Sequence, residues 1–238
     1  MLENLKLRNI LFLDIETVPQ FGKYEELPED FVKLWEKKCS TFRKETEEEK
    51  PSDVYRRAGI YAEFGKIVCI SCGAFTNENK FRIRSFYGHD EKQILIDFSS
   101  MLQKHFYSPD KLLCAHNGKE FDFPFICRRM LINQLPLPAI LDIAGKKPWE
   151  IAHLDTMELW KFGDYKSYTT LVLLASIFGI PTPKDDIDGS TVWRVYWEEK
   201  NLERIVTYCQ KDVLTVAQIF KKFRCEDLIK QEDVSFAD

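Results

Sequence analysis

The chain has 238 residues, of which 45% are hydrophobic and 30% charged, a composition typical of a globular protein with a substantial core. Its formal net charge of −4 argues against a protein that coats duplex nucleic acid through a basic surface, but not against an enzyme that holds a chain end in a cleft. No apolar run approaches the roughly 20 residues that span a bilayer, and no secretory signal is recognisable, so we expect a cytoplasmic protein without membrane contacts.

Seven cysteines, an odd number, agree with a reducing compartment. Cys69 and Cys72 have C-x-x-C spacing, but no second pair and no nearby histidines follow to complete a zinc site. The surrounding run from Ile67 to Phe75 is typical of a buried strand. We therefore interpret these cysteines as core thiols and not as metal ligands or a redox pair.

The predicted elements begin with a strand over residues 8–14. The segment 19–65 is rich in charge, and Phe31, Leu34 and Trp35 recur at helical spacing, which predicts an insertion of one or two helices. A dense charge run at 44–50 is interpreted as a solvated face or loop, with a flap over a cleft as the alternative.

Two strands over 66–75 and 81–87, separated by a polar turn, predict a hairpin. Asp90 followed by Gln93 predicts the start of a helix that ends near residue 106. Further along we expect strands at 112–115 and 153–156, and helices at 120–133, 171–178 and 198–222. This order predicts a single α/β domain over 1–238 with a mixed five-stranded sheet and helices on both faces.

The first strand carries two acids at its end. Since side chains alternate along a strand, Asp14 and Glu16 should share one face while Leu13 and Ile15 share the other. Two carboxylates at the end of a buried strand repel each other unless a cation lies between them. The stretch therefore indicates either a metal site or a strand that simply ends in water.

Two later segments could bring acids to the same place, because sites of open α/β sheets lie at the carboxyl ends of strands. Asp122 follows the strand at 112–115, and Tyr208 and Asp212 are one turn apart on the last long helix. Each also has a structural explanation: Asp122 as a first-turn helix residue, Tyr208 as a rim residue, Asp212 as the partner of a lysine.

Together these residues form a recognisable set. Asp-x-Glu-Thr at 14–17, Asn-x3-Phe-Asp at 117–122 and Tyr-x3-Asp at 208–212 resemble the three motifs of the DEDD superfamily of 3′–5′ exonucleases, in its DEDDy form. The chain looks most similar to the proofreading exonuclease domain of family B DNA polymerases and to standalone bacterial forms of it, from about residue 8 to 221. The segment 19–65 is larger than in minimal members, and we expect no proofreading in cis because no polymerase domain follows.

The resemblance implies a ribonuclease H-like fold and a two-metal hydrolysis of phosphodiester bonds from a single-stranded 3′ end, with DNA favoured over RNA. It implies Mg²⁺ or Mn²⁺ as cofactors, with Asp14 bridging both ions and with ligands Asp14, Glu16, Asp122 and Asp212. By the same resemblance Tyr208 orients the attacking water, and the terminal nucleotide contacts Thr17, Asn117 and Phe121. The alternatives are an oligoribonuclease-like RNA trimmer and a non-catalytic nucleic-acid-binding module.

The remaining polar and aromatic candidates are given structural interpretations. We expect Asp155 to make structural hydrogen bonds and the histidines at 116 and 153 to be polar core or edge residues. The loop at 184–188 is interpreted as solvated, with phosphate contact by Lys184 and Arg194 as the alternative. Trp193 and Trp197 are interpreted as helix packing, with base stacking as the alternative.

Overall fold

The computed structural model describes residues 2–42, 50–76, 80–164, 166–181 and 187–237. At the centre of the fold is a six-stranded sheet in the order β5-β4-β1-β2-β3-β6. β1 pairs antiparallel with β2 and parallel with β4, so the sheet is mixed, as predicted. The strands are β1 (Ile10–Pro19), β2 (Gly65–Phe75), β3 (Phe81–Tyr87), β4 (Leu112–Ala115), β5 (Leu154–Asp155) and β6 (Val234–Ala237).

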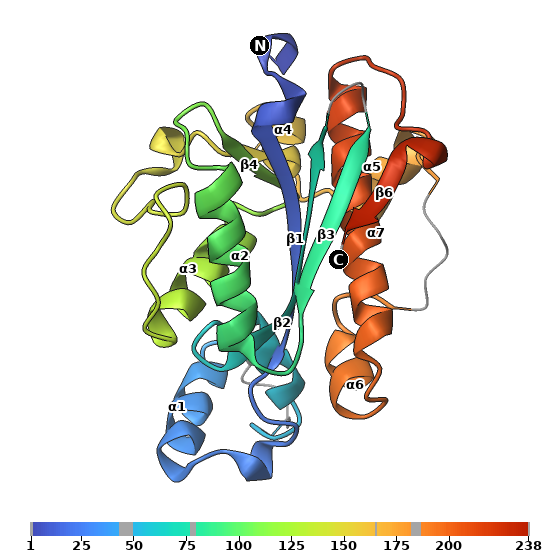
Figure 1. Ribbon diagram of the computed structural model, residues 1–238. Helices are drawn as coiled ribbons and strands as arrows, with labels where there is room; N and C mark the ends of the chain where they lie inside the picture. The colour runs from blue at the N-terminus through green and yellow to red at the C-terminus, as the bar shows by residue number, and fades with distance from the viewer. Residues whose placement is uncertain (1, 43–49, 77–79, 165, 182–186, 238) are drawn as a thin grey trace.

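Helices cover both faces of the sheet, which confirms the α/β prediction (Figure 1). On one face α2 and α3 pack over Leu13 and Ile15 of β1. On the other face α7 packs over Phe12, whose ring centroid lies 5.6 Å from that of Phe220. The helices are α1 (Glu29–Cys39), α2 (Glu91–His105), α3 (Asp122–Ile132), α4 (Thr156–Lys161), α5 (Leu171–Ile177), α6 (Val192–Trp197) and α7 (Leu202–Phe223).

The expected strand count of five is wrong by one. The sixth strand, β6, pairs parallel with the edge strand β3. Its four residues are all at least partly exposed, and a run this short is not enough to predict a strand from the sequence. The backbone hydrogen bonds offered by the edge of β3 determine its conformation instead.

The segment 19–65 contains one helix, α1, and two short 3-10 helices at Tyr24–Glu26 and Tyr55–Ile60, the second of which we call η4. These elements share a small aromatic core around Trp35. In Figure 1 they lie at the end of the sheet to which β1 runs. Most of the charge run at 44–50, and with it the choice between a solvated face and a flap, lies outside the described residues.

A β-bulge interrupts the pairing of β1 with β2 between Glu16 and Thr17. As a result Val68 and Cys69, which are consecutive in β2, both pack on the face covered by α6 and α7. The spacing of Cys69 and Cys72 then places the two thiols on opposite faces, both buried and free. This geometry confirms that they are core thiols and not a chelating pair.

Three polar contacts fix the helices of the first face. Asp90 accepts a hydrogen bond from the backbone N–H of Gln93 at 3.2 Å, which confirms the predicted helix start. Glu91 and Arg129 form a buried ion pair at 2.6 Å that joins α2 to α3. Glu91 also accepts from the backbone N–H of Ile67 at 2.7 Å, so the pair is tied to the start of β2.

No helix among the described residues is long and apolar enough to cross a bilayer.

Candidate active site

A cavity of about 450 Å³ opens beside the second half of β1. Its walls come from β1, η4, the loop before α3, the loop before α6, and α6 and α7 themselves. The lining residues are Asp14, Ile15, Glu16, Thr17, Arg56, Arg57, Gly59, Ile60, Phe121, Gly189, Ser190, Trp193, Tyr208 and Asp212.

The two acids of β1 share the face that α7 covers, as the strand alternation predicts. Glu16 is 6% exposed. Carboxylate oxygens of Asp14 and Glu16 and the sulfur of Cys209 all lie within 4.8 Å of one another. Burial raises the pKa of the Cys209 thiol well above its usual value, so it stays protonated and donates to the Asp14 carboxylate at 3.3 Å. Cys209 is therefore a hydrogen-bond donor to the site and not a thiolate ligand.

Asp122 is the first residue of α3 and is 3% exposed. β4 pairs with β1 only as far as Phe12, which leaves the backbone beyond that point without a strand partner on this side. The Asp122 carboxylate accepts from the backbone N–H of Ile15 at 3.2 Å. Asp122 is therefore a first-turn helix residue and also lies next to the stretch of β1 that carries Asp14 and Glu16.

The long helix α7 contributes the last two members of the set. Tyr208 and Asp212 both line the cavity, and burial together with the charge of the Asp212 carboxylate raises the pKa of the Tyr208 hydroxyl. One turn of helix separates them, so both project from the side of α7 next to its buried stripe of Cys209 and Val213.

The carboxylates raise one another's pKa. The pKa of Asp14 lies well above its usual value because the group is buried and faces the charges of Asp122 and Asp212. Burial, with the charges of Asp14 and Asp212, does the same for the pKa of Glu16. Burial raises the pKa of Asp122 to about 7. Acids that repel one another favour a cation between them, and their oxygen donors are those that Mg²⁺ and Mn²⁺ prefer, so the residues fit the expected ions.

The three expected substrate contacts do not all come together. Thr17 and Phe121 line the acid cavity. Asn117 instead lines a neighbouring cavity of about 450 Å³. Its backbone has a φ of 62°, and its N–H donates to the Asp155 carboxylate at 2.9 Å.

The structural interpretation of Asp155 and the two histidines is confirmed. Asp155, 3% exposed, accepts hydrogen bonds from the backbone N–H groups of Asn117, Lys119, Met157 and Glu158. His116 contacts the Thr156 hydroxyl and the Thr169 carbonyl, and His153 contacts the Leu113 N–H and the Ile140 carbonyl.

Replacing Asp155 by Ala should destabilise the fold by about 2–4 kcal/mol, because four backbone donors, one buried and three partly buried, lose their acceptor. For a chain of this size that loss lowers the melting temperature by roughly 5–15 °C, measured by circular dichroism. Asp164→Ala is the matched control, since Asp164 is exposed and, among the described residues, its carboxylate accepts only from the N–H of Lys166. Equal melting temperatures for the two variants would contradict the role given to Asp155.

Of the aromatic and basic candidates that the structure describes, Trp193 lines the acid cavity and Trp197 and Arg194 do not. Trp193 lines the acid cavity, whereas Trp197 donates its indole N–H to the Pro19 carbonyl at 3.0 Å and so is a packing residue. Arg194 pairs with Glu199 at 3.2 Å and does not line the cavity. Lys184 and most of its loop lie outside the described residues.

Sequence reasoning missed Arg56 and Arg57, which line the cavity from η4. In the sequence these two arginines directly precede the small residues Ala58 and Gly59, which are buried in the structure. This pattern is only a weak indication of a packed turn that carries two cations. Sequence reasoning also did not single out Cys209 as a neighbour of the acids. Its position three residues before Asp212 places both on one helix face, which could have indicated contact with the acids.

A model of the family described as a predicted 3′–5′ exonuclease related to the exonuclease domain of PolB matches residues 60–234. The matched range includes Asp122, Tyr208 and Asp212, and begins after Asp14 and Glu16.

Among solved structures, the chain is similar to the family B DNA polymerase of the hyperthermophilic archaeon Pyrobaculum calidifontis, with 16% identity and a TM-score of 0.48. The similarity covers 87% of this chain and 24% of that polymerase, so this chain spans about a quarter of the polymerase's length. The family match extends over most of the chain and confirms the resemblance drawn from the three motifs: the chain belongs to the family of predicted 3′–5′ exonucleases related to the exonuclease domain of PolB.

Proposed function

We propose that this protein is a metal-dependent 3′–5′ exonuclease that hydrolyses phosphodiester bonds from the 3′ end of single-stranded nucleic acid, with DNA favoured over RNA. One observation carries the proposal. Asp14 and Glu16 from β1, Asp122 from α3, and Tyr208 and Asp212 from α7 converge on one end of the sheet. A structural role alone does not account for so many buried and half-buried acids, because each raises the cost of ionising the others.

The metal ligands in this proposal are Asp14, Glu16, Asp122 and Asp212. Their combined charge of about −4 would balance two divalent cations. When bound, two such ions supply an activated water, stabilise charge on the phosphoryl oxygens and assist the leaving 3′ oxygen. Running the degradation assay with each ion separately distinguishes Mg²⁺ from Mn²⁺ as the cofactor.

Tyr208 acts through a protonated hydroxyl. Burial and the neighbouring carboxylates raise its pKa above the usual value near 10, so the phenol does not serve as a general base at neutral pH. Asp212, one helical turn away, is the carboxylate whose charge acts most strongly on the phenol. In this position the hydroxyl can orient a water beside the scissile phosphate without removing its proton.

The preference for a single strand rests on the cavity walls. A volume of about 450 Å³ is that of a site for a small ligand such as one terminal nucleotide. Phe121 and Trp193 both line the cavity, and unpaired bases stack on aromatic rings of this kind. DNA is favoured because the family is related to the exonuclease domain of a DNA polymerase.

A 5′-labelled single strand incubated with the protein and Mg²⁺ or Mn²⁺ should shorten stepwise from its 3′ end, and EDTA should stop the reaction. DNA and RNA of the same sequence, run side by side on a denaturing gel, decide the substrate class. A strand whose 3′ end is buried in a blunt duplex should be degraded more slowly. Absence of a ladder on both polymers with both ions would refute the exonuclease.

A further inference from the structure

Two arginines from outside the acid motifs form part of the cavity wall. Among the described residues that line the cavity, Arg56 and Arg57 of η4 are the only lysines or arginines. They face a site whose other charged residues are Asp14, Glu16 and Asp212. The cavity therefore combines two cationic side chains with three acidic ones.

The backbone that carries the arginines is fixed against β1. A Cβ atom on Gly59 would lie 3.1 Å from backbone atoms of Val18, so the absence of a side chain lets η4 approach the strand this closely. Tyr55 and Ala58 are buried at 3% and 0% exposure. Because η4 is anchored on both sides of the two arginines, their side chains start from a defined position beside the acids.

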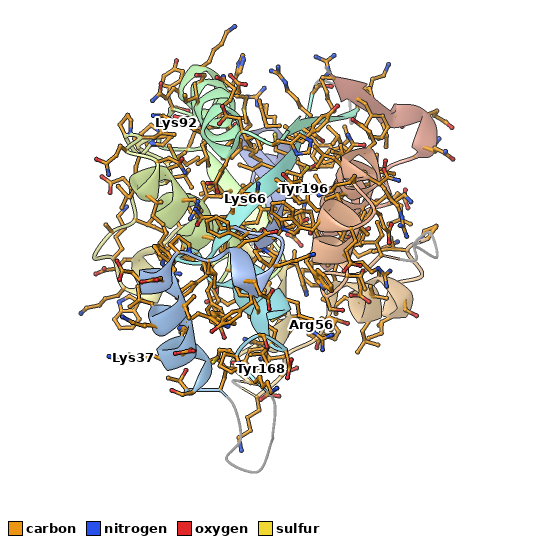
Figure 2. All side chains as sticks on the ribbon, turned by 90° about the horizontal axis from the view of Figure 1, so that it is seen from below. Lys37, Arg56, Lys66, Lys92, Tyr168 and Tyr196 are labelled. Atoms are coloured by element: carbon orange, nitrogen blue, oxygen red, sulfur yellow. The ribbon has the colours of Figure 1, made fainter. Side chains whose placement is uncertain are left out.

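The two guanidinium groups are available to a ligand. Arg56 is exposed and makes no ion pair or hydrogen bond with the residues that the structure describes. Arg57 lies with its guanidinium 4.6 Å from the ring centroid of Phe42, a contact that leaves its N–H edges free for other acceptors. Figure 2 looks onto this end of the molecule and shows Arg56 well apart from Lys37 of α1.

The charge balance of the site favours phosphate groups as the ligands of these two guanidinium groups. Four carboxylates and two divalent ions nearly cancel, so the metal site alone provides little attraction for the further negative charges of a nucleic acid strand. Each additional phosphodiester in the cleft needs a cation, and a guanidinium matches its two free oxygens in a bidentate manner.

We propose that Arg56 and Arg57 form a phosphate-binding site for the substrate strand, holding phosphodiester groups on the 5′ side of the bond that is cut. The inference rests on the proposed exonuclease function. It gives the segment 19–65 a direct part in substrate binding: α1 and its aromatic core hold η4 in place, and η4 presents the two cations. Removing either guanidinium should weaken binding of a strand and leave the chemistry at the metal site intact.

The test uses fluorescence anisotropy with a 5′-fluorescein oligothymidylate, with Ca²⁺ in place of Mg²⁺ and with the oligonucleotide checked for integrity on a gel. Arg56→Ala and Arg57→Ala should each raise the Kd about tenfold. Each should also flatten the plot of log Kd against log salt by about 0.7, the contribution of one lost phosphate contact on a single strand. Arg56→Lys should keep the salt slope and recover part of the affinity, because it retains the charge without the bidentate geometry.

Arg128→Ala is the matched control, since Arg128 is exposed on α3 and does not line the cavity.

A second substrate, the p-nitrophenyl ester of thymidine 5′-phosphate, has no phosphate on the 5′ side of the scissile bond. For Arg56→Ala and Arg57→Ala, the loss of kcat/KM on this substrate should be much smaller than the loss on the oligonucleotide, because it offers these guanidinium groups no phosphate on that side. A melting temperature equal to that of wild type shows that the variants are folded.

The outcomes separate the two proposals. If wild type degrades the oligonucleotide but Arg56→Ala and Arg57→Ala bind it with unchanged Kd and salt slope, the phosphate site is wrong and the exonuclease stands. If wild type hydrolyses neither substrate yet the arginine variants bind the strand more weakly, the exonuclease fails while the phosphate site stands. If wild type does not bind the strand at all, the phosphate site is overturned.

Discussion

Asp14→Asn should lower kcat for 3′ degradation by at least about a thousandfold, a loss of about 4 kcal/mol in transition-state stabilisation. The charges of Asp122 and Asp212 are those that act most strongly on Asp14, whereas Asp122 is the weakest of those acting on Glu16, so we expect Asp14 to be the ligand shared by both ions. The measurement is single-turnover degradation of a labelled strand in saturating Mg²⁺. The substitution preserves shape and removes one charge from a cluster that repels itself, so the fold should remain intact.

The same assay on Glu16→Gln and Tyr208→Phe tests the ranking of residues. Glu16→Gln should be less damaging than Asp14→Asn, because Glu16 would bind a single ion. Tyr208→Phe removes one oriented hydroxyl and should cost about 10²-fold. Asp97→Asn, an exposed acid on α2, is the control and should have wild-type activity. A Tyr208→Phe variant slower than Asp14→Asn would show that the bridging role of Asp14 is wrong.

The parts of the site that could be predicted are those governed by short-range geometry. Alternation along a strand places Asp14 and Glu16 on one face, and helical spacing places Tyr208 and Asp212 on one side of α7. The carboxyl end of β1 then follows from the general rule for sites in α/β sheets. These arguments need only the period of the element and its position in the chain.

The parts that could not be predicted depend on how separate segments pack. Arg56 reaches the cavity because Gly59 fits against Val18, a contact between residues about forty positions apart that no local pattern encodes. Asn117 lies outside the acid cavity because the backbone after β4 turns with a positive φ and is held by Asp155. β6 forms by adding to an exposed edge, where pairing of backbone groups outweighs side-chain preference.

The metal-free protein should lose stability as the pH rises from 6.5 to 8. The pKa values of Asp14, Glu16 and Asp122 lie above the values near 4 of unfolded chains, that of Asp122 at about 7. The folded state therefore binds more protons than the unfolded state, and stability falls as these groups ionise. The pKa values of His116 and His153 are lowered by burial, so their effect is confined to pH below about 6.5. Thermal unfolding in EDTA across this range is the measurement.

Saturating Mg²⁺ or Mn²⁺ should reverse that loss, because a cation replaces the protons as the counter-charge of the cluster. At a concentration 100 times the Kd, binding stabilises the folded state by about 2.7 kcal/mol, equivalent to a rise of roughly 5–10 °C in melting temperature. The rise should be larger at pH 8 than at pH 6.5, where protons compete with the metal. Asp14→Asn should reduce both the pH dependence in EDTA and the shift with Mg²⁺. A shift of the same size with KCl at matched ionic strength would mean that general screening, and not ion binding by these acids, stabilises the fold.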